Sequence, residues 1–194
     1  MLTFDTLFDF EKALAKYTGA PYVVLTDGCT HAIELSMLWY GVKSCSFSAY
    51  TYLSVPLTIS MLGINYTLLD EQWTGEYCFH GTNIWDSARR LEPNMYRPGQ
   101  VQCLSFGNGK PLQLGRVGAI LLDDQEAYLG MSRMRSDGRD LRISPWTLQQ
   151  SFGRGFHYCP SLEHCAKGLE LLPLMRPQCQ QATYPDCRQI SIVT

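Results

Sequence analysis

Residues 84–118 contain the motifs Ile84-Trp85-Asp86-Ser87-Ala88-Arg89-Arg90, Cys103-Leu104-Ser105-Phe106-Gly107-Asn108-Gly109-Lys110 and Leu114-Gly115-Arg116-Val117-Gly118. The first is an apolar run that ends in an acid. The second is an apolar run that ends in a serine and a Gly-rich turn bearing a lysine. Such runs predict buried strands, and ligands of open α/β sheets bind beyond the carboxyl ends of the strands. We therefore expect Asp86 and Lys110 to face one ligand in a single crevice.

Lys110 differs from the other lysines in its surroundings. The chain has five lysines, and Lys110 is the only one between Lys43 and Lys167. A lysine flanked by apolar segments can lose part of its hydration, which frees its amine to attack a carbonyl carbon. Because Gly-Asn-Gly marks a turn, a solvated hairpin lysine is the alternative. The motif is not a P-loop, since the first glycine and the Ser/Thr after the lysine are missing.

The hydrophobic pattern predicts helices that alternate with strands. Helices are expected at residues 4–18, 30–40, 54–62, 123–134 and 161–172, and strands at 21–26, 44–48, 65–69, 77–79, 83–86, 101–106 and 118–122. This order predicts an α/β three-layer sandwich with a mostly parallel central sheet. The helix at 30–40 is apolar around most of its circumference, so either the core of one chain or a partner subunit covers its second side.

Composition narrows the class of protein. At 194 residues, 45% hydrophobic and 18% charged, the chain can form one domain with a substantial core. A net charge of −2 gives no reason to expect binding to nucleic acid or to an anionic membrane. The eight cysteines include no Cys-x-x-Cys pair, and the sequence has neither a signal peptide nor an apolar run near the roughly twenty residues that span a bilayer. We expect buried thiols in a reducing cytoplasm.

Several motifs, taken together and in order, resemble the DegT-type family of pyridoxal-phosphate-dependent sugar aminotransferases. These motifs are Phe10 to Val24, Thr26 to Leu35, Thr51-Tyr52, Asp86-Ser87-Ala88, Ser105 to Lys110 and Gly115 to Gly118. The resemblance implies the large domain of the fold type I enzymes, here as a PLP-binding α/β domain at residues 1–140. Residues 141–194 are then a reduced C-terminal segment that packs on this domain or on a partner subunit.

The resemblance also implies roles for individual residues. Lys110 matches the lysine that forms a Schiff base with the aldehyde of pyridoxal 5'-phosphate and then moves a proton. Asp86 matches the aspartate that keeps the pyridine nitrogen protonated, and Tyr52 matches the aromatic residue that stacks on the ring. Thr30, at a helix N-terminus, and Ser105 match phosphate-binding residues.

Three positions depart from the family pattern. Cys29 stands where the family usually has Gly, Arg89 where it has Gln or His, and Val117 where a Gly-Gly pair is usual. By position, Cys29 and Arg89 still belong to the expected cofactor site. The segment Gly155-Phe156-His157-Tyr158-Cys159-Pro160 resembles the family's crossing segment, so His157 is expected to reach the cofactor phosphate of the neighbouring subunit.

Two further patterns lie in the C-terminal third. Residues 133–154 contain five arginines against two aspartates, which indicates either a subsite for a diphosphate or carboxylate or a solvated face. His157, Cys159, His164 and Cys165, with Cys179 and Cys187, are alternative metal ligands, but their spacings match no zinc pattern. We therefore expect no metal site.

The resemblance implies a homodimeric aminotransferase that moves an amino group from an amino acid to a nucleotide-linked keto-sugar. We expect neither nucleic acid nor a membrane as a partner. The alternative is a non-catalytic or degenerate protein of the same fold with a structural or regulatory role. A sugar dehydratase of the same cofactor class is disfavoured, because Lys110 occupies the position at which that variant has histidine. An unrelated α/β domain requires Lys110 to be exposed and Asp86 to lie far from it.

Overall fold

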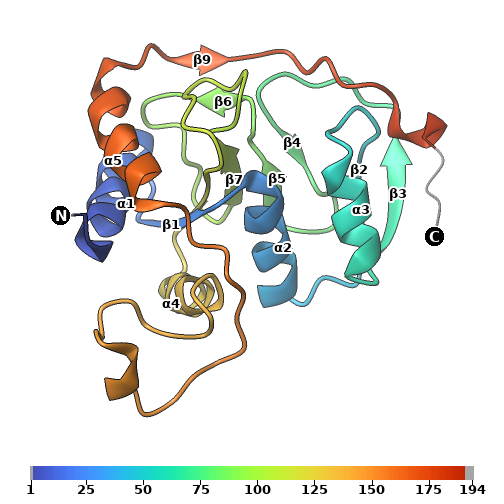
Figure 1. The fold of residues 1–194 in the computed structure, drawn as a ribbon. Helices are drawn as coiled ribbons and strands as arrows, with labels where there is room; N and C mark the ends of the chain where they lie inside the picture. The colour runs from blue at the N-terminus through green and yellow to red at the C-terminus, as the bar shows by residue number, and fades with distance from the viewer. Residues whose placement is uncertain (1, 191–194) are drawn as a thin grey trace.

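A five-stranded sheet forms the centre of the computed structural model, which describes residues 2–190 (Figure 1). Its strands lie in the order β1-β8-β7-β5-β4. Their bounds are β1 Tyr22–Thr26, β8 Gly118–Leu122, β7 Val101–Ser105, β5 Ile84–Asp86 and β4 Tyr77–Cys78. A parallel pair, β2 (Ser44–Ser48) and β3 (Asn65–Leu69), joins this sheet through the bridge between Ser46 and His80.

The sheet is mixed, and the expected mostly parallel arrangement is not confirmed. Within the five-stranded sheet of the described residues, β5 and β7 pair in parallel, whereas β1–β8, β7–β8 and β4–β5 pair antiparallel. A parallel pair needs a long crossover. Only a short turn joins β4 to β5, and residues 106–117 between β7 and β8 contain no helix, so the chain reverses direction at both places.

Helices cover both faces of the sheet, because strand side chains alternate between two apolar clusters. Val23, Leu104 and Leu121 pack toward helices α1 (Phe4–Thr18) and α5 (Leu162–Leu171). Val24, Cys103 and Ile120 pack toward α2 (Cys29–Trp39), α3 (Ser54–Met61) and α4 (Gln125–Met134). The result is three layers, as expected.

Local sequence sets the ends and contacts of these helices. The Thr3 side chain accepts a hydrogen bond from the backbone N–H of Asp5 at the start of α1, and Gly19 ends that helix at φ 77°. Gly168 allows α5 to lie against α1, since a Cβ at this position would be 2.4 Å from the Phe10 ring. Helix α2 packs on β7 and β8 and touches α3 and α4, so one chain already covers most of it.

An ion pair braces α1, β1 and the end of α4. Glu11 and Arg135 are 5% and 1% exposed, and they contact each other directly. Glu11 Oε1 also accepts the N–H of Leu25 at 2.9 Å, while Arg135 donates to the carbonyl of Leu25 at 2.9 Å. We call this set the Glu11–Arg135 brace. Each charge in it has a partner of opposite sign and a backbone partner.

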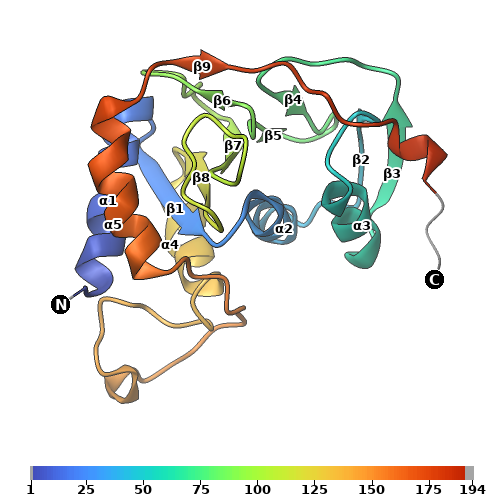
Figure 2. The same ribbon diagram turned by 45° about the horizontal axis from the view of Figure 1, so that its top comes forward.

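The C-terminal tail, defined here as residues 175–189, crosses the molecule from α5 to the β2–β3 pair (Figures 1 and 2). Its strand β9 (Gln178–Cys179) pairs with β6 (Arg90–Leu91). Beyond β9, the carbonyl of Gln180 accepts from Gly75, the N–H of Ala182 donates to Trp73, and that of Cys187 donates to Ala49. Backbone bonds therefore anchor the tail along its length.

The remaining secondary structure of the described residues consists of short 3-10 helices at Trp146–Leu148, Leu172–Leu174 and Cys187–Gln189. Residues 138–157 form a loop below α4 in Figure 1. In the part of the chain that the structure describes, no helix has the length and apolar character needed to cross a membrane.

Candidate active site

A cavity of about 670 Å³ opens beyond the carboxyl ends of β1, β5 and β7. This is the crevice that the strand-end motifs predict. Seven of the eight expected site residues line it, namely Cys29, Thr30, Tyr52, Asp86, Arg89, Ser105 and Lys110. Asp86 and Lys110 therefore share one cavity, whereas the alternative of an unrelated α/β domain requires them to lie far apart.

Asp86 ends β5 and lies at the base of this cavity. Its side chain is 4% exposed and accepts the N–H of Ala88 at 2.9 Å. Burial raises the pKa of Asp86, while the Ala88 N–H and the positive charge of Lys110 act against that rise. No residue between 2 and 190 forms an ion pair with it. A ligand with an N–H group would supply the missing partner.

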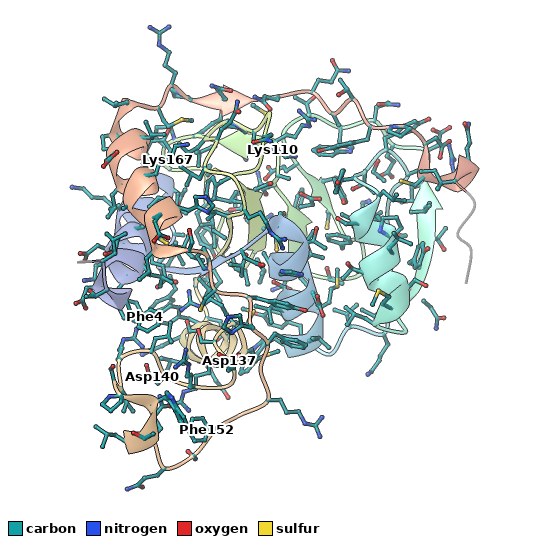
Figure 3. All side chains as sticks on the ribbon, viewed as in Figure 1. Phe4, Lys110, Asp137, Asp140, Phe152 and Lys167 are labelled. Atoms are coloured by element: carbon teal, nitrogen blue, oxygen red, sulfur yellow. The ribbon has the colours of Figure 1, made fainter. Side chains whose placement is uncertain are left out.

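Lys110 reaches the cavity from the turn after β7. The side chain is half-buried, and Nζ donates a hydrogen bond to the Tyr184 hydroxyl at 2.7 Å. In Figure 3 Lys110 lies beneath the C-terminal tail. This lysine is therefore not the solvated hairpin lysine of the alternative.

The N-terminus of α2 supplies an anion-binding end. Thr30 and Ser54 share a hydrogen bond of 2.6 Å between their hydroxyl oxygens. The first turn of α2 contains no acidic residue, so its free N–H groups and helix dipole favour an anion. Gly118 of β8 makes room here, since a Cβ at that position would lie 2.4 Å from the backbone carbon of Gly28.

Cys29 lies between this end and Asp86. Its Sγ is 3.8 Å from Asp86 Oδ1 and 3.5 Å from the carbonyl oxygen of Cys103. Burial, together with the nearby Asp86 charge, raises the pKa of Cys29 well above its usual value. Cys29 is thus a neutral thiol and a poor nucleophile at pH 7.

The C-terminal tail contributes a residue that the sequence analysis missed. The Tyr184 ring lies 4.9 Å from the Arg89 guanidinium carbon and 6.1 Å from the Tyr52 ring. Gln180, also in the tail, accepts a long 3.4 Å hydrogen bond from Arg89. Tyr52 itself is 61% exposed, which leaves its ring free to cover a ligand.

His31, another residue without a prediction, lines the cavity beside Thr30. It pairs with Asp27 and stacks on Tyr158 at a ring distance of 3.7 Å. Burial and the nearby Glu34 raise the pKa of Tyr158 to about 12. The position of His31 directly after Thr30 was the signal in the sequence that could have identified it.

His157 does not line the cavity. Its side chain is 86% exposed and pairs with Asp137, and Figure 3 places Asp137 far from Lys110. Its expected reach into a neighbouring subunit stays a prediction. The alternative metal ligands do not converge either: within residues 2–190, no three His, Cys, Asp or Glu side chains are grouped as a metal site would require.

The arginines of residues 133–154 do not line this cavity. Arg135 belongs to the brace, Arg139 lies 6.0 Å from the Phe4 ring, and Arg142 lies 5.1 Å from the Phe8 ring. Arg139 and Arg142 also pair with Asp137 and Asp140. These three arginines connect the loop and α4 to α1, so their contacts favour a structural role over a ligand subsite.

Sequence comparison agrees with the motifs. Residues 2–76 match the DegT/DnrJ/EryC1/StrS aminotransferase family. The match covers the first helices and strands and the Gly28-Cys29-Thr30 end of the cavity. No curated protein matches the chain by sequence.

Solved structures share the fold over most of the chain. A DegT DnrJ EryC1 StrS aminotransferase from Brucella abortus is 16% identical with a TM-score of 0.73, over 89% of this chain and 59% of that one. AtS13 from Actinomadura melliaura is 18% identical with a TM-score of 0.74, over 89% and 60%. DesI, solved with its TDP-sugar product, is 17% identical with a TM-score of 0.69, over 88% and 54%. The chain thus spans between 54% and 60% of the length of these proteins.

Proposed function

We propose that this chain is a pyridoxal-phosphate-dependent aminotransferase. The observation that carries the proposal is the convergence of Lys110 and Asp86 from two strand ends on one cavity. The family match of residues 2–76 and the shared fold support it.

The residues of the cavity fit the cofactor. A buried carboxylate without an ion-pair partner suits a protonated pyridine nitrogen, and a half-buried amine suits an aldehyde. The hydroxyls of Thr30, Ser54 and Ser105, with the N-terminus of α2, suit a phosphate. When bound, pyridoxal phosphate supplies an electron sink that stabilises a carbanion at the substrate carbon.

Each residue then has a defined task. Asp86 Oδ would accept a hydrogen bond from the protonated pyridine nitrogen, and burial would strengthen that bond by excluding water. Lys110 Nζ would hold the cofactor through its aldehyde and would move a proton at the reacting carbon. Tyr52 would cover the ring face, while Thr30 and Ser105 would bind the phosphate.

We propose an amino acid as donor and a nucleotide-linked keto-sugar as acceptor. DesI, which shares this fold, was solved with a TDP-sugar product, and this supports the sugar class. No feature of the cavity selects one sugar. The expected cytoplasmic location is part of the same proposal.

We also propose a homodimer. Four apolar side chains of the loop at 138–157 are exposed by 42–66%, namely Ile143, Trp146, Leu148 and Phe152. Exposed apolar clusters of this kind mark contact surfaces. Sedimentation of the wild type should give a dimer, and the double substitution Trp146→Ser with Leu148→Ser should shift it toward the monomer. A monomeric wild type would contradict this part.

A second candidate is a cofactor-binding protein of the same fold without turnover. The departures from the family pattern at Cys29 and Arg89, which both line the cavity, favour it. Mixing the loaded protein with single amino acids separates the two. For an aminotransferase we expect the visible absorption of the cofactor to disappear and a keto acid to form in equal amount, with no change in Lys110→Ala. Cofactor binding without keto acid from any amino acid would support the second candidate.

A further inference from the structure

Arg89 is a cationic group in the cavity that the proposed chemistry leaves without a task. It follows β5 and lines the same cavity as Lys110. It forms no ion pair within residues 2–190, and its Nε is buried without a hydrogen-bond partner. Its one side-chain hydrogen bond, to Gln180, is 3.4 Å long. The side chain is half-buried, and its buried Nε lacks the acceptor that a buried N–H normally has.

The C-terminal tail holds Arg89 in position. The Tyr184 ring lies 4.9 Å from the guanidinium carbon, and Gln180 accepts a hydrogen bond from Nη1 of Arg89. The backbone of Arg89 accepts the N–H of Gln180 at 2.8 Å and donates to the carbonyl of Gly75 at 3.1 Å. These contacts orient the planar guanidinium group of Arg89 before a ligand binds, so little conformational entropy is lost on binding.

The other arginine in the cavity differs. Arg116 is 79% exposed, and its guanidinium already pairs with Asp27 at 3.2 Å. Arg89 is therefore the arginine with free hydrogen-bonding capacity beside Lys110.

We propose that Arg89, oriented by Tyr184 and Gln180, is a carboxylate-binding subsite next to Lys110. Two parallel N–H···O bonds to one carboxylate match the planar fork of arginine. This deepens the proposed function and rests on it, because the carboxylate in question is that of the amino-acid donor. Arg89 thus selects donors by charge and shape, while Tyr184 is a positioning residue.

The test uses the cofactor-free protein and two probes of equal shape. Glutarate carries two carboxylates, and glutaramide replaces both with neutral amides. We expect calorimetry to give tighter binding of glutarate than of glutaramide to the wild type. Since hydrogen bonds to charged groups contribute about 1.5–3 kcal/mol, Arg89→Gln should weaken glutarate binding about 10- to 100-fold.

Variants separate Arg89 from other cations. Arg89→Lys keeps the charge without the fork and should recover part of the affinity. Arg116→Gln is the matched control and should change it less than about twofold. Tyr184→Phe should retain binding, because the ring remains, whereas Tyr184→Leu should weaken it about two- to fivefold.

Equal binding of glutarate and glutaramide by the wild type would overturn the inference even if no variant folds. Loss of binding in Lys110→Gln with no loss in Arg89→Gln would overturn it too. Cofactor incorporation at Lys110 is measured on the same proteins: incorporation without carboxylate selectivity rejects only the subsite, and selectivity without incorporation rejects only the proposed function.

Discussion

The Glu11–Arg135 brace and the Lys110 cavity both remove charged groups from water, and they satisfy these groups differently. In the brace, Glu11 and Arg135 pair with each other and with the backbone of Leu25. In the cavity, Asp86 has no ion-pair partner among residues 2–190, and Nε of Arg89 has no acceptor. The charged groups of the brace are all paired within the protein, whereas Asp86 and Arg89 in the cavity lack partners that a ligand would supply.

Breaking the brace should have the largest effect. Glu11→Leu leaves the Arg135 charge buried without its partner, so the free energy of unfolding should fall by about 3–5 kcal/mol. The double variant Glu11→Leu with Arg135→Met should lose much less than the sum of the two single losses, because no buried charge remains. Urea unfolding measures all three. Additive losses would mean that the two residues act independently.

Crowding the phosphate end should have the next largest effect. Gly118→Ala places a Cβ 2.4 Å from the backbone of Gly28, which must displace the first turn of α2. We expect a loss of about 1–3 kcal/mol in stability and a larger loss of affinity for pyridoxal phosphate than for pyridoxal.

Gly28→Ala is the matched control for stability. A Cβ at Gly28 meets nothing within 4 Å, and its φ of 178° is open to any residue. Its thermal unfolding should stay close to that of the wild type. Equal losses of stability in Gly118→Ala and Gly28→Ala would show that the close contact between residue 118 and the backbone of Gly28 is not the cause.

Neutralising Asp86 should stabilise the cofactor-free protein, in contrast to Glu11→Leu and Gly118→Ala, which destabilise it. Burial raises its pKa above 3.8, so the folded state holds the proton more tightly than the unfolded state does. Its contribution to stability is then lost as pH rises from 3.8 through the folded pKa. Asp86→Asn cannot ionise, and the cofactor-free variant should melt higher than the wild type at pH 7.

Thermal unfolding at several pH values checks this sign. The difference between Asp86→Asn and the wild type should shrink toward pH 4. A variant that melts lower at pH 7 would show that Asp86 has a stabilising partner in the cofactor-free protein.

The smallest effect should come from an exposed pair. Arg116 is 79% exposed beside Asp27, so water already screens their attraction. Arg116→Gln should change the free energy of unfolding by less than about 0.5 kcal/mol. A larger change would indicate that Arg116 contributes to the cavity more than its exposure suggests.

Local patterns predicted much of this molecule. The ranges 4–18, 44–48, 65–69 and 118–122 agree with α1, β2, β3 and β8, because apolar spacing and capping residues act over a few positions. The meeting of Asp86 and Lys110 followed from two motifs that each end a strand. The mixed sheet did not follow, since strand direction depends on the connections between strands and not on the strands themselves.

The sequence pattern does not predict that the C-terminal tail lines the cavity. Tyr184 meets Lys110 across 74 positions of the chain, and the backbone bonds that anchor the tail carry no signal in side-chain type. Two-residue strands such as β6 and β9 are likewise too short for a periodic pattern. Long-range contacts of this kind depend on tertiary packing.

The most direct test of the cavity is to add pyridoxal phosphate to the purified protein, reduce with borohydride and locate the modified residue by mass spectrometry. We expect a visible absorption band before reduction and a single label on Lys110 that Lys110→Ala abolishes. No band, or a label distributed over Lys12, Lys16 and Lys167, would contradict the assignment of this cavity to the cofactor.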